Sequence, residues 1–262
     1  VVFNKNIGPL ISTDMTRCIQ CTRCVRFLQE VGGMMELGMV GRGEHSEITA
    51  YVDRSIQSEL SGNIIDLCPV GALTSKPFRY KARTWELIRR PTLAHHDSLG
   101  SPLEAHIKQN KVIRMLPRED ESINECWISD RDRFSYEGLN SEDRLQVPMV
   151  KEKGQWKESD WETALSIVSE KLKHIVNKEG PEELGMLISP QSSSEEGILA
   201  KKISASLKSF NIDHRIRQSD FSIQHQGAHW LGSHIDGLEN FDQYFVIGSN
   251  LRNEQPLLTS RI

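Results

Sequence analysis

The later part of the chain alternates between stretches with helical spacing and short apolar stretches. Apolar residues within 161–176 recur every three or four positions, which predicts an amphipathic helix. Leu184–Ile188 is a short apolar run that predicts a buried strand, and residues 194–210 again have helical spacing. A second strand is expected at Tyr244–Gly248, with a helix starting near Glu254–Pro256. Strands alternating with helices predict an open parallel α/β sheet.

The first third of the chain has shorter elements, which end at glycine or proline residues. A helix is predicted through Val25–Leu28, ending at Gly32 and Gly33. A second short helix is predicted at Ile64 and Ile65, just before Cys68 and Pro69. Proline disfavours helical backbone at the residue before it, so this helix should end at the cysteine.

Between these two parts, the pattern predicts a small β-rich region. Ala105–Ile107 and Val112–Met115, joined through Gln109 and Asn110, predict a β-hairpin. Three large aromatic residues are expected to anchor a small core of their own: Trp85, Trp127 and Phe134. We therefore expect three domains, over residues 1–82, 83–139 and 140–262.

Composition and charge exclude several classes of protein. With 262 residues, 32 Lys and Arg and 36 Asp and Glu, the chain has a formal net charge of −4. Nucleic-acid-binding domains usually carry a large positive excess, so no nucleic-acid partner is expected. No apolar run has the length of a membrane-spanning helix and no signal peptide opens the chain, so neither a membrane span nor secretion is expected. Because it begins with Val1 and ends with Ile262, we expect a piece of a longer polypeptide.

The cysteines carry the most specific chemistry. Cys18, Cys21 and Cys24 form a C-x2-C-x2-C run, and Cys68 precedes Pro69. This spacing is unsuited to disulfides and predicts reduced thiols that bind a metal. A bacterial ferredoxin run is C-x2-C-x2-C-x3-C-P, so one triad and one distant Cys-Pro predict one [4Fe-4S] cluster. Zinc is the alternative, although structural zinc usually takes paired C-x2-C knuckles or histidine.

Other residues near the cysteines have weaker interpretations. Arg17, Arg23 and Arg26 could offset the negative charge of a cluster, or could form an ordinary solvated face. The fifth cysteine, Cys126, is expected to have a packing role. The pairs His95–His96 and His225/His229 are weak metal candidates, since the second lacks the glutamate of H-E-x-x-H.

Longer segments resemble a known family, and they extend over nearly the whole chain. The segments are Asn6–Ile11, Thr16–Phe27, Glu36–Gly43, Glu59–Asn63, Asp66–Thr74, Trp127–Phe134, Ser189–Glu196 and Ile247–Pro256. They resemble the large iron–sulfur subunit of respiratory complex I, the NADH–quinone oxidoreductase.

The resemblance implies a mixed α/β and α+β fold. Its parts would be an N-terminal ferredoxin-like [4Fe-4S] domain, a small β-rich domain and the start of a molybdopterin-oxidoreductase-like α/β sheet domain. In that family the cysteines matching Cys18, Cys21, Cys24 and Cys68 bind a [4Fe-4S] cluster that relays electrons from NADH towards quinone. Further clusters would lie before Val1, and no catalytic residue or small-molecule substrate is expected within this segment.

The resemblance also implies partners and a location. The partners would be other subunits of the peripheral arm, on the cytoplasmic side of the bacterial inner membrane and with no direct membrane span. Where some relatives carry a further C-x2-C-x3-C, this chain has Pro91–Gly100 without cysteine, and Ser129 stands at the matching fourth position. The segment Arg215–Asp220, where molybdenum enzymes often place a catalytic cysteine, also has none, so no molybdopterin is expected.

Two alternatives remain open at this point. One is a subunit of a soluble hydrogenase or of a molybdenum-dependent formate dehydrogenase. The other is a zinc-stabilised scaffold with no redox role.

Overall fold

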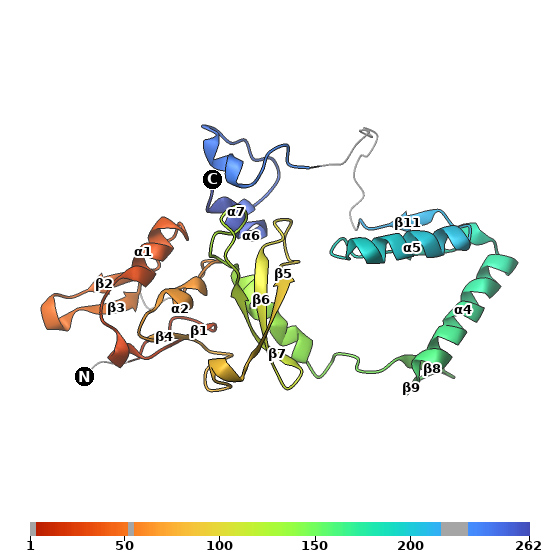
Figure 1. The fold of residues 1–262 in the computed structure, drawn as a ribbon, viewed down its shortest axis with the longest axis horizontal. Helices are drawn as coiled ribbons and strands as arrows, with labels where there is room; N and C mark the ends of the chain where they lie inside the picture. Colours follow the sequence, from red (N-terminus) through yellow and green to blue (C-terminus); the bar gives the residue numbers. More distant parts are fainter. Residues whose placement is uncertain (1–3, 52–54, 216–229) are drawn as a thin grey trace. The chain divides into compact units, whose positions relative to one another are not determined.

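The protein is described by a computed structural model that covers residues 4–51, 55–215 and 230–262 (Figure 1). The chain divides into two compact units. Residues 1–142 and 229–262 form the first unit, and residues 143–228 form the second. The three-domain division expected from the sequence stays a prediction.

The beginning of the first unit is built from two small antiparallel ribbons and two short helices. Strand β1 (Ile11–Thr13) pairs with β4 (Leu73–Ser75), and β2 (Leu37–Val40) pairs with β3 (Glu47–Ala50). Helix α1 (Arg23–Glu30) and helix α2 (Asn63–Leu67) are those that the sequence predicts. In β1 and β3 every second residue is buried, as a strand with one face on a core requires.

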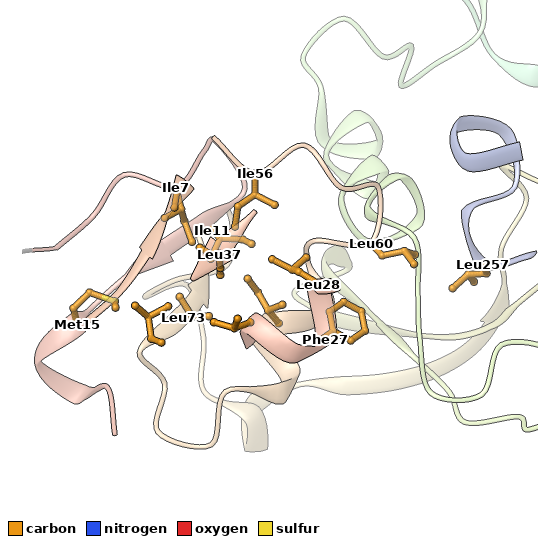
Figure 2. Close-up of a cluster of buried hydrophobic side chains, with 14 residues drawn as sticks. Ile7, Ile11, Met15, Phe27, Leu28, Leu37, Ile56, Leu60, Leu73 and Leu257 are labelled. Atoms are coloured by element: carbon orange, nitrogen blue, oxygen red, sulfur yellow. The ribbon is translucent and has the colours of Figure 1, made fainter. Parts of the chain in front are cut away.

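One hydrophobic core holds these elements together (Figure 2). Leu28 of α1 and Ile64 of α2 are completely buried in it, beside Leu37 of β2. The sequence-distant Leu257 of α7 (Pro256–Thr259) joins the same core. Burial of such side chains contributes roughly 1.5–3 kcal/mol each. The two short helices are therefore fixed mainly by packing, since neither is long enough to be stable alone.

A three-stranded antiparallel sheet follows in the order β5–β6–β7. Its strands are β5 (Ile88–Leu93), β6 (Pro102–Lys108) and β7 (Lys111–Pro117). Gln109 and Asn110 join the last two strands with φ of 49° and 60°, the positive values of a tight hairpin turn. The predicted hairpin is thus confirmed. Helix α3 (Asp130–Phe134) follows, with the Ser129 hydroxyl accepting a hydrogen bond from the Asp132 backbone N–H.

The aromatic anchors predicted for this region are wrong in part. The Trp85 side chain is 82% exposed, and Trp127 packs on the first core with its ring 4.8 Å from that of Phe27. Phe134 is buried. The second core cluster consists of aliphatic residues: Ala94, Leu103, Ile128 and Met115. Leu103 and Ala105, two residues apart on the central strand β6, are both buried, so aliphatic side chains of modest size fill the space on this face.

The second unit contains the predicted helices. A hairpin of β8 (Met149–Glu152) and β9 (Gln155–Glu158) precedes α4 (Trp161–Lys178). Strand β10 (Gly185–Leu187), α5 (Ser194–Ser206) and β11 (Asn211–Asp213) follow, and β10 pairs with β11 in parallel. The structure confirms the helix from 161 and the strand at 184–188, but the predicted burial of this strand is wrong, since Leu187 is 70% exposed. Helix α5 ends at Ser206 instead of 210, shortly before Lys208, whose φ is 58°.

The strand predicted at Tyr244–Gly248 is wrong. These residues are not in a strand, and Phe245 and Ile247 are 89% and 77% exposed. This segment belongs to the first unit, whereas the parallel strand pair lies in the second. Helices α6 (Leu251–Glu254) and α7 follow, so the predicted helix start near residue 254 is confirmed. Among the described residues, no helix combines the length and apolarity needed to cross a bilayer.

The first turn of α5 offers a test of helix capping. The Ser193 hydroxyl accepts a hydrogen bond from the Glu196 backbone N–H, and the Glu196 carboxylate accepts one from the Ser193 N–H. We expect Ser193→Ala to lower the free energy of unfolding by about 1 kcal/mol, as for other N-caps. Urea denaturation followed by circular dichroism measures this. Ser194→Ala, one residue into the helix, is the matched control, and an equal loss in both variants would contradict the capping role.

Candidate metal centre

Four cysteine side chains line one cavity beside the hydrophobic core of the first unit. They are Cys18, Cys21, Cys24 and Cys68, and the cavity holds about 390 Å³ of empty space, open solvent included. Its other lining residues are mostly apolar: Met15, Ile19, Thr22, Arg23, Ile48, Val70, Ala72 and Leu73. Met15, Ile48 and Leu73 also belong to the core, so the cavity wall is fixed by the packing of Figure 2.

Backbone geometry turns the first three cysteines towards the cavity. Gln20 and Thr22, one in each two-residue gap, have φ of 56° and 60°, in the left-handed region. Such residues reverse the chain direction locally, at a cost of roughly 1–2 kcal/mol each for a side chain other than glycine. The Gln20 N–H donates a hydrogen bond to Cys18 Sγ at 3.4 Å. The short loop therefore directs three thiols and at least one backbone donor to the same place.

The fourth cysteine, Cys68, lies at the end of a short helix, as predicted from the proline that follows it. Helix α2 ends at Leu67, and Cys68 has extended backbone with φ −76° and ψ 106°. Pro69 favours this conformation at the preceding residue. Gly71 then takes a φ of 67°, in the left-handed region that favours glycine. Because Ile64 fixes α2 in the core, the position of Cys68 follows from the helix that precedes it.

The electrostatics of the thiols show how closely they are grouped. Burial, together with the charges of Cys18, Cys68 and Cys21, raises the pKa of Cys24 to about 11, against the lowering effect of the Val25 backbone hydrogen bond. Metal ligands must be deprotonated, so four thiolates here would repel one another until cations neutralise them. Within the described part of the chain, no three or more His, Cys, Asp or Glu side chains are placed to hold one metal ion. The four thiols lie instead around the wall of the cavity.

These residues fit a [4Fe-4S] cluster by their chemistry. Such clusters take four thiolates, and hydrogen bonds to sulfur and limited solvent access set their reduction potential. The cavity supplies four thiols, a hydrogen bond to the Cys18 sulfur and an apolar wall. The assignment of these four cysteines as ligands remains our prediction.

Only one of the three arginines singled out from the sequence lines the cavity. It is Arg23, in the first turn of α1. Arg17 pairs with Asp14 at 3.0 Å and Arg26 with Glu30 at 3.1 Å. The structure thus places Arg23 next to the thiols, whereas Arg17 and Arg26 are paired with carboxylates.

Sequence reasoning missed a buried polar network that fixes α2. The Asn63 side chain, 1% exposed, donates hydrogen bonds to the carbonyls of Leu60 and Ile128 and accepts one from the Ile128 N–H. The Asp130 carboxylate accepts hydrogen bonds from the Gly62 N–H and the Ser61 hydroxyl, and burial raises the pKa of Asp130. Partners 65 to 69 residues apart leave no local signal in the sequence.

An ion pair between Arg133 and Asp66 completes this network. Arg133, 4% exposed, donates to Asp66 at 2.6 Å and to Asn63 Oδ1 at 3.2 Å. Asp66 lies two residues before Cys68, so α3 and the preceding loop hold the helix that carries the fourth cysteine.

The remaining candidates lie away from the cavity. Cys126 is exposed, so the packing role expected for it is wrong, and it does not line the cavity. His96 Nδ1 lies 2.6 Å from the Asp132 carboxylate, whose other oxygen accepts a hydrogen bond from the Ser129 hydroxyl. In place of the additional cysteines of some relatives, the segment Pro91–Gly100 and Ser129 thus contribute to a hydrogen-bonded group of His96, Asp132 and Ser129. His225, His229 and most of the segment 215–220 lie outside the described residues.

Comparison with family models divides the chain into three matched regions. Residues 8–74 match the ferredoxin-like domain of NADH-quinone oxidoreductase subunit 3. Residues 92–137 match the 4Fe-4S domain of the NADH-ubiquinone oxidoreductase NDSU1/NuoG-like family, and residues 144–262 match molybdopterin oxidoreductase. These matches bear out the fold class expected from the sequence. The region 92–137 contains Cys126 as its one cysteine.

Similar proteins cover the whole chain. An NADH-quinone oxidoreductase subunit of Rickettsia felis is 41% identical over 263 aligned residues, which are 100% of this chain and 38% of the relative. The NADH-ubiquinone oxidoreductase 75 kDa subunit of Reclinomonas americana is 41% identical, over 100% of this chain and 39% of that protein. The NADH dehydrogenase [ubiquinone] iron-sulfur protein 1 of Solanum tuberosum is 42% identical, over 100% of this chain and 35% of that protein. The chain thus spans less than two fifths of each of these relatives.

Proposed function

Because the chain belongs, along its whole length, to the family of large iron–sulfur subunits of NADH-quinone oxidoreductase, we propose that it relays electrons through one [4Fe-4S] cluster. The ligands are Cys18, Cys21, Cys24 and Cys68. The observation that carries this proposal is the lining of one cavity by these four side chains, from two segments of the chain.

The chain's own residues bind the cluster and adjust its surroundings. Four thiolates hold it, and when bound it supplies one-electron transfer. The Gln20 N–H donates to Cys18 Sγ, which favours the more negatively charged, reduced form. Apolar side chains such as Ile48 and Leu73 exclude water from the inner wall. No residue here needs to act as an acid, a base or a nucleophile.

The whole protein's role is part of the same proposal. NADH would be the electron source and quinone the destination, with other peripheral-arm subunits as partners on the cytoplasmic side of the membrane. The region matching molybdopterin oxidoreductase would contribute its fold to the assembly without that cofactor.

Elemental analysis with electron paramagnetic resonance (EPR) tests the proposal. We expect the anaerobically purified chain to contain iron and acid-labile sulfide in equal amounts and to give a [4Fe-4S] signal after reduction. Zinc without iron in an EPR-silent protein would show a zinc scaffold and contradict the proposal. Bound molybdenum would instead support the molybdenum oxidoreductase alternative.

A further inference from the structure

A second hollow in the first unit has a basic lining. Five of its lining side chains are cationic, namely Arg17, Arg79, Lys81, Arg83 and Lys108, and Glu86 is its one lining carboxylate. The hollow is broad, with about 1030 Å³ of empty space, open solvent included. It adjoins the proposed cluster site, since Arg17 precedes Cys18 and the lining Gly71 follows Cys68 by three residues.

Carboxylates of the described residues neutralise only part of this charge. Asp14 lies 3.0 Å from Arg17 and 3.8 Å from Arg79, and Glu86 lies 2.6 Å from Lys108. Lys81 and Arg83 are both exposed, and neither forms an ion pair with a carboxylate in the described part of the chain. The hollow therefore keeps a positive excess in a chain whose net charge is −4.

Exposed aromatic side chains accompany the charge. Tyr80 lines the hollow, is 90% exposed and lies under the Arg79 guanidinium, 4.8 Å from the ring centroid. Trp85, 82% exposed, lies on the short helix Thr84–Glu86 that also supplies Glu86. Tryptophan, tyrosine and arginine are the residues most enriched at the energetic centres of protein–protein interfaces. An open, aromatic and basic surface of this breadth fits a polypeptide better than a small anion.

We propose that this basic hollow docks an acidic, carboxylate-rich segment of a neighbouring protein subunit. The proposal rests on the proposed function, which supplies the neighbouring subunits. Arginine guanidinium groups bind carboxylates in bidentate geometry, so Arg83 would provide direction as well as charge. Lys81 would add long-range attraction, and Trp85 and Tyr80 would provide the apolar contact area.

Crosslinking in the intact complex tests the identity of the occupant. A zero-length carbodiimide reagent joins lysine amines to carboxylates in direct contact. We expect Lys81 to be joined to an aspartate or glutamate of another subunit. Lys111, exposed on β7 opposite the lining Lys108 but itself outside the lining, is the matched control lysine. The proposal would be overturned if Lys81 formed crosslinks only within its own polypeptide. It would also be overturned if Lys81 formed no crosslink and still reacted with a small amine-reactive label.

Charge reversal provides the second measurement. The double variant Lys81→Glu/Arg83→Glu is expected to lose the crosslink and to slow subunit association about tenfold or more at low salt, whereas Lys111→Glu keeps the wild-type rate. The EPR signal should be unchanged in both variants, so failure here is distinguishable from failure of the electron-relay function. Unaltered association of the double variant would overturn the proposal. The proposal would also be overturned if inorganic triphosphate protected Lys81 of the isolated chain from the amine-reactive label as well as assembly into the complex does. That result would show a small-anion site.

Discussion

Replacing Cys68 by serine is expected to abolish the [4Fe-4S] signal, whereas Cys126→Ser should leave it intact. Cys68 is the one cysteine of the cavity that comes from the second segment, so its loss leaves three thiols from a single loop. Serine is a poorer ligand for iron because its hydroxyl is far less acidic than a thiol. Cys126 is exposed and outside the cavity, which makes it a matched control with the same chemical change.

The measurement is the iron content together with the EPR spectrum of the reduced protein. Metal binding and folding are coupled, so Cys68→Ser should also unfold at lower urea concentration than Cys126→Ser. A full signal in Cys68→Ser would show that the fourth ligand is elsewhere. Loss of iron from Cys126→Ser, but not from Cys68→Ser, would show that the cluster is bound outside the cavity.

The features that could be predicted from sequence are those set by local chemistry. The C-x2-C-x2-C loop, the end of α2 before Pro69 and the hairpin at Gln109 and Asn110 each depend on a few neighbouring residues. The grouping of Cys68 with the other three followed from ligand chemistry rather than from proximity in the chain. All four cysteines line one cavity, and their role as ligands stays a prediction.

The features that could not be predicted depend on partners far along the chain. Tyr244–Gly248 has the composition of a strand, but no strand of the described residues pairs with it. Trp85 is as apolar as Trp127, yet only Trp127 meets a partner, Phe27, one hundred residues away. Helix α4 has an apolar stripe but no buried residue, and Leu165 and Val168 are 59% and 51% exposed. Periodicity reports which face is apolar and does not report what covers it.

Asn63 should matter more for stability than its size suggests. Its side chain satisfies both the N–H and the carbonyl of Ile128, so Asn63→Ala leaves these two buried groups without that partner, whereas the Leu60 carbonyl keeps the Asn63 backbone N–H. An unsatisfied buried polar group costs roughly 1–3 kcal/mol, and we expect a total loss of about 3 kcal/mol. The variant should also lose iron faster to a chelator, because α2 carries Cys68 at its end. Urea denaturation and the rate of iron release measure the two effects.

Asn140→Ala is the matched control for this prediction. Asn140 is exposed and its amide donates one hydrogen bond, to the Val112 carbonyl at 2.9 Å. Its removal should change the free energy of unfolding by no more than about 0.5 kcal/mol and leave iron release unchanged. If Asn63→Ala lost stability but released iron at the wild-type rate, the network would stabilise the fold without positioning Cys68. Since the network joins α2 to the loop before α3, we expect both effects together.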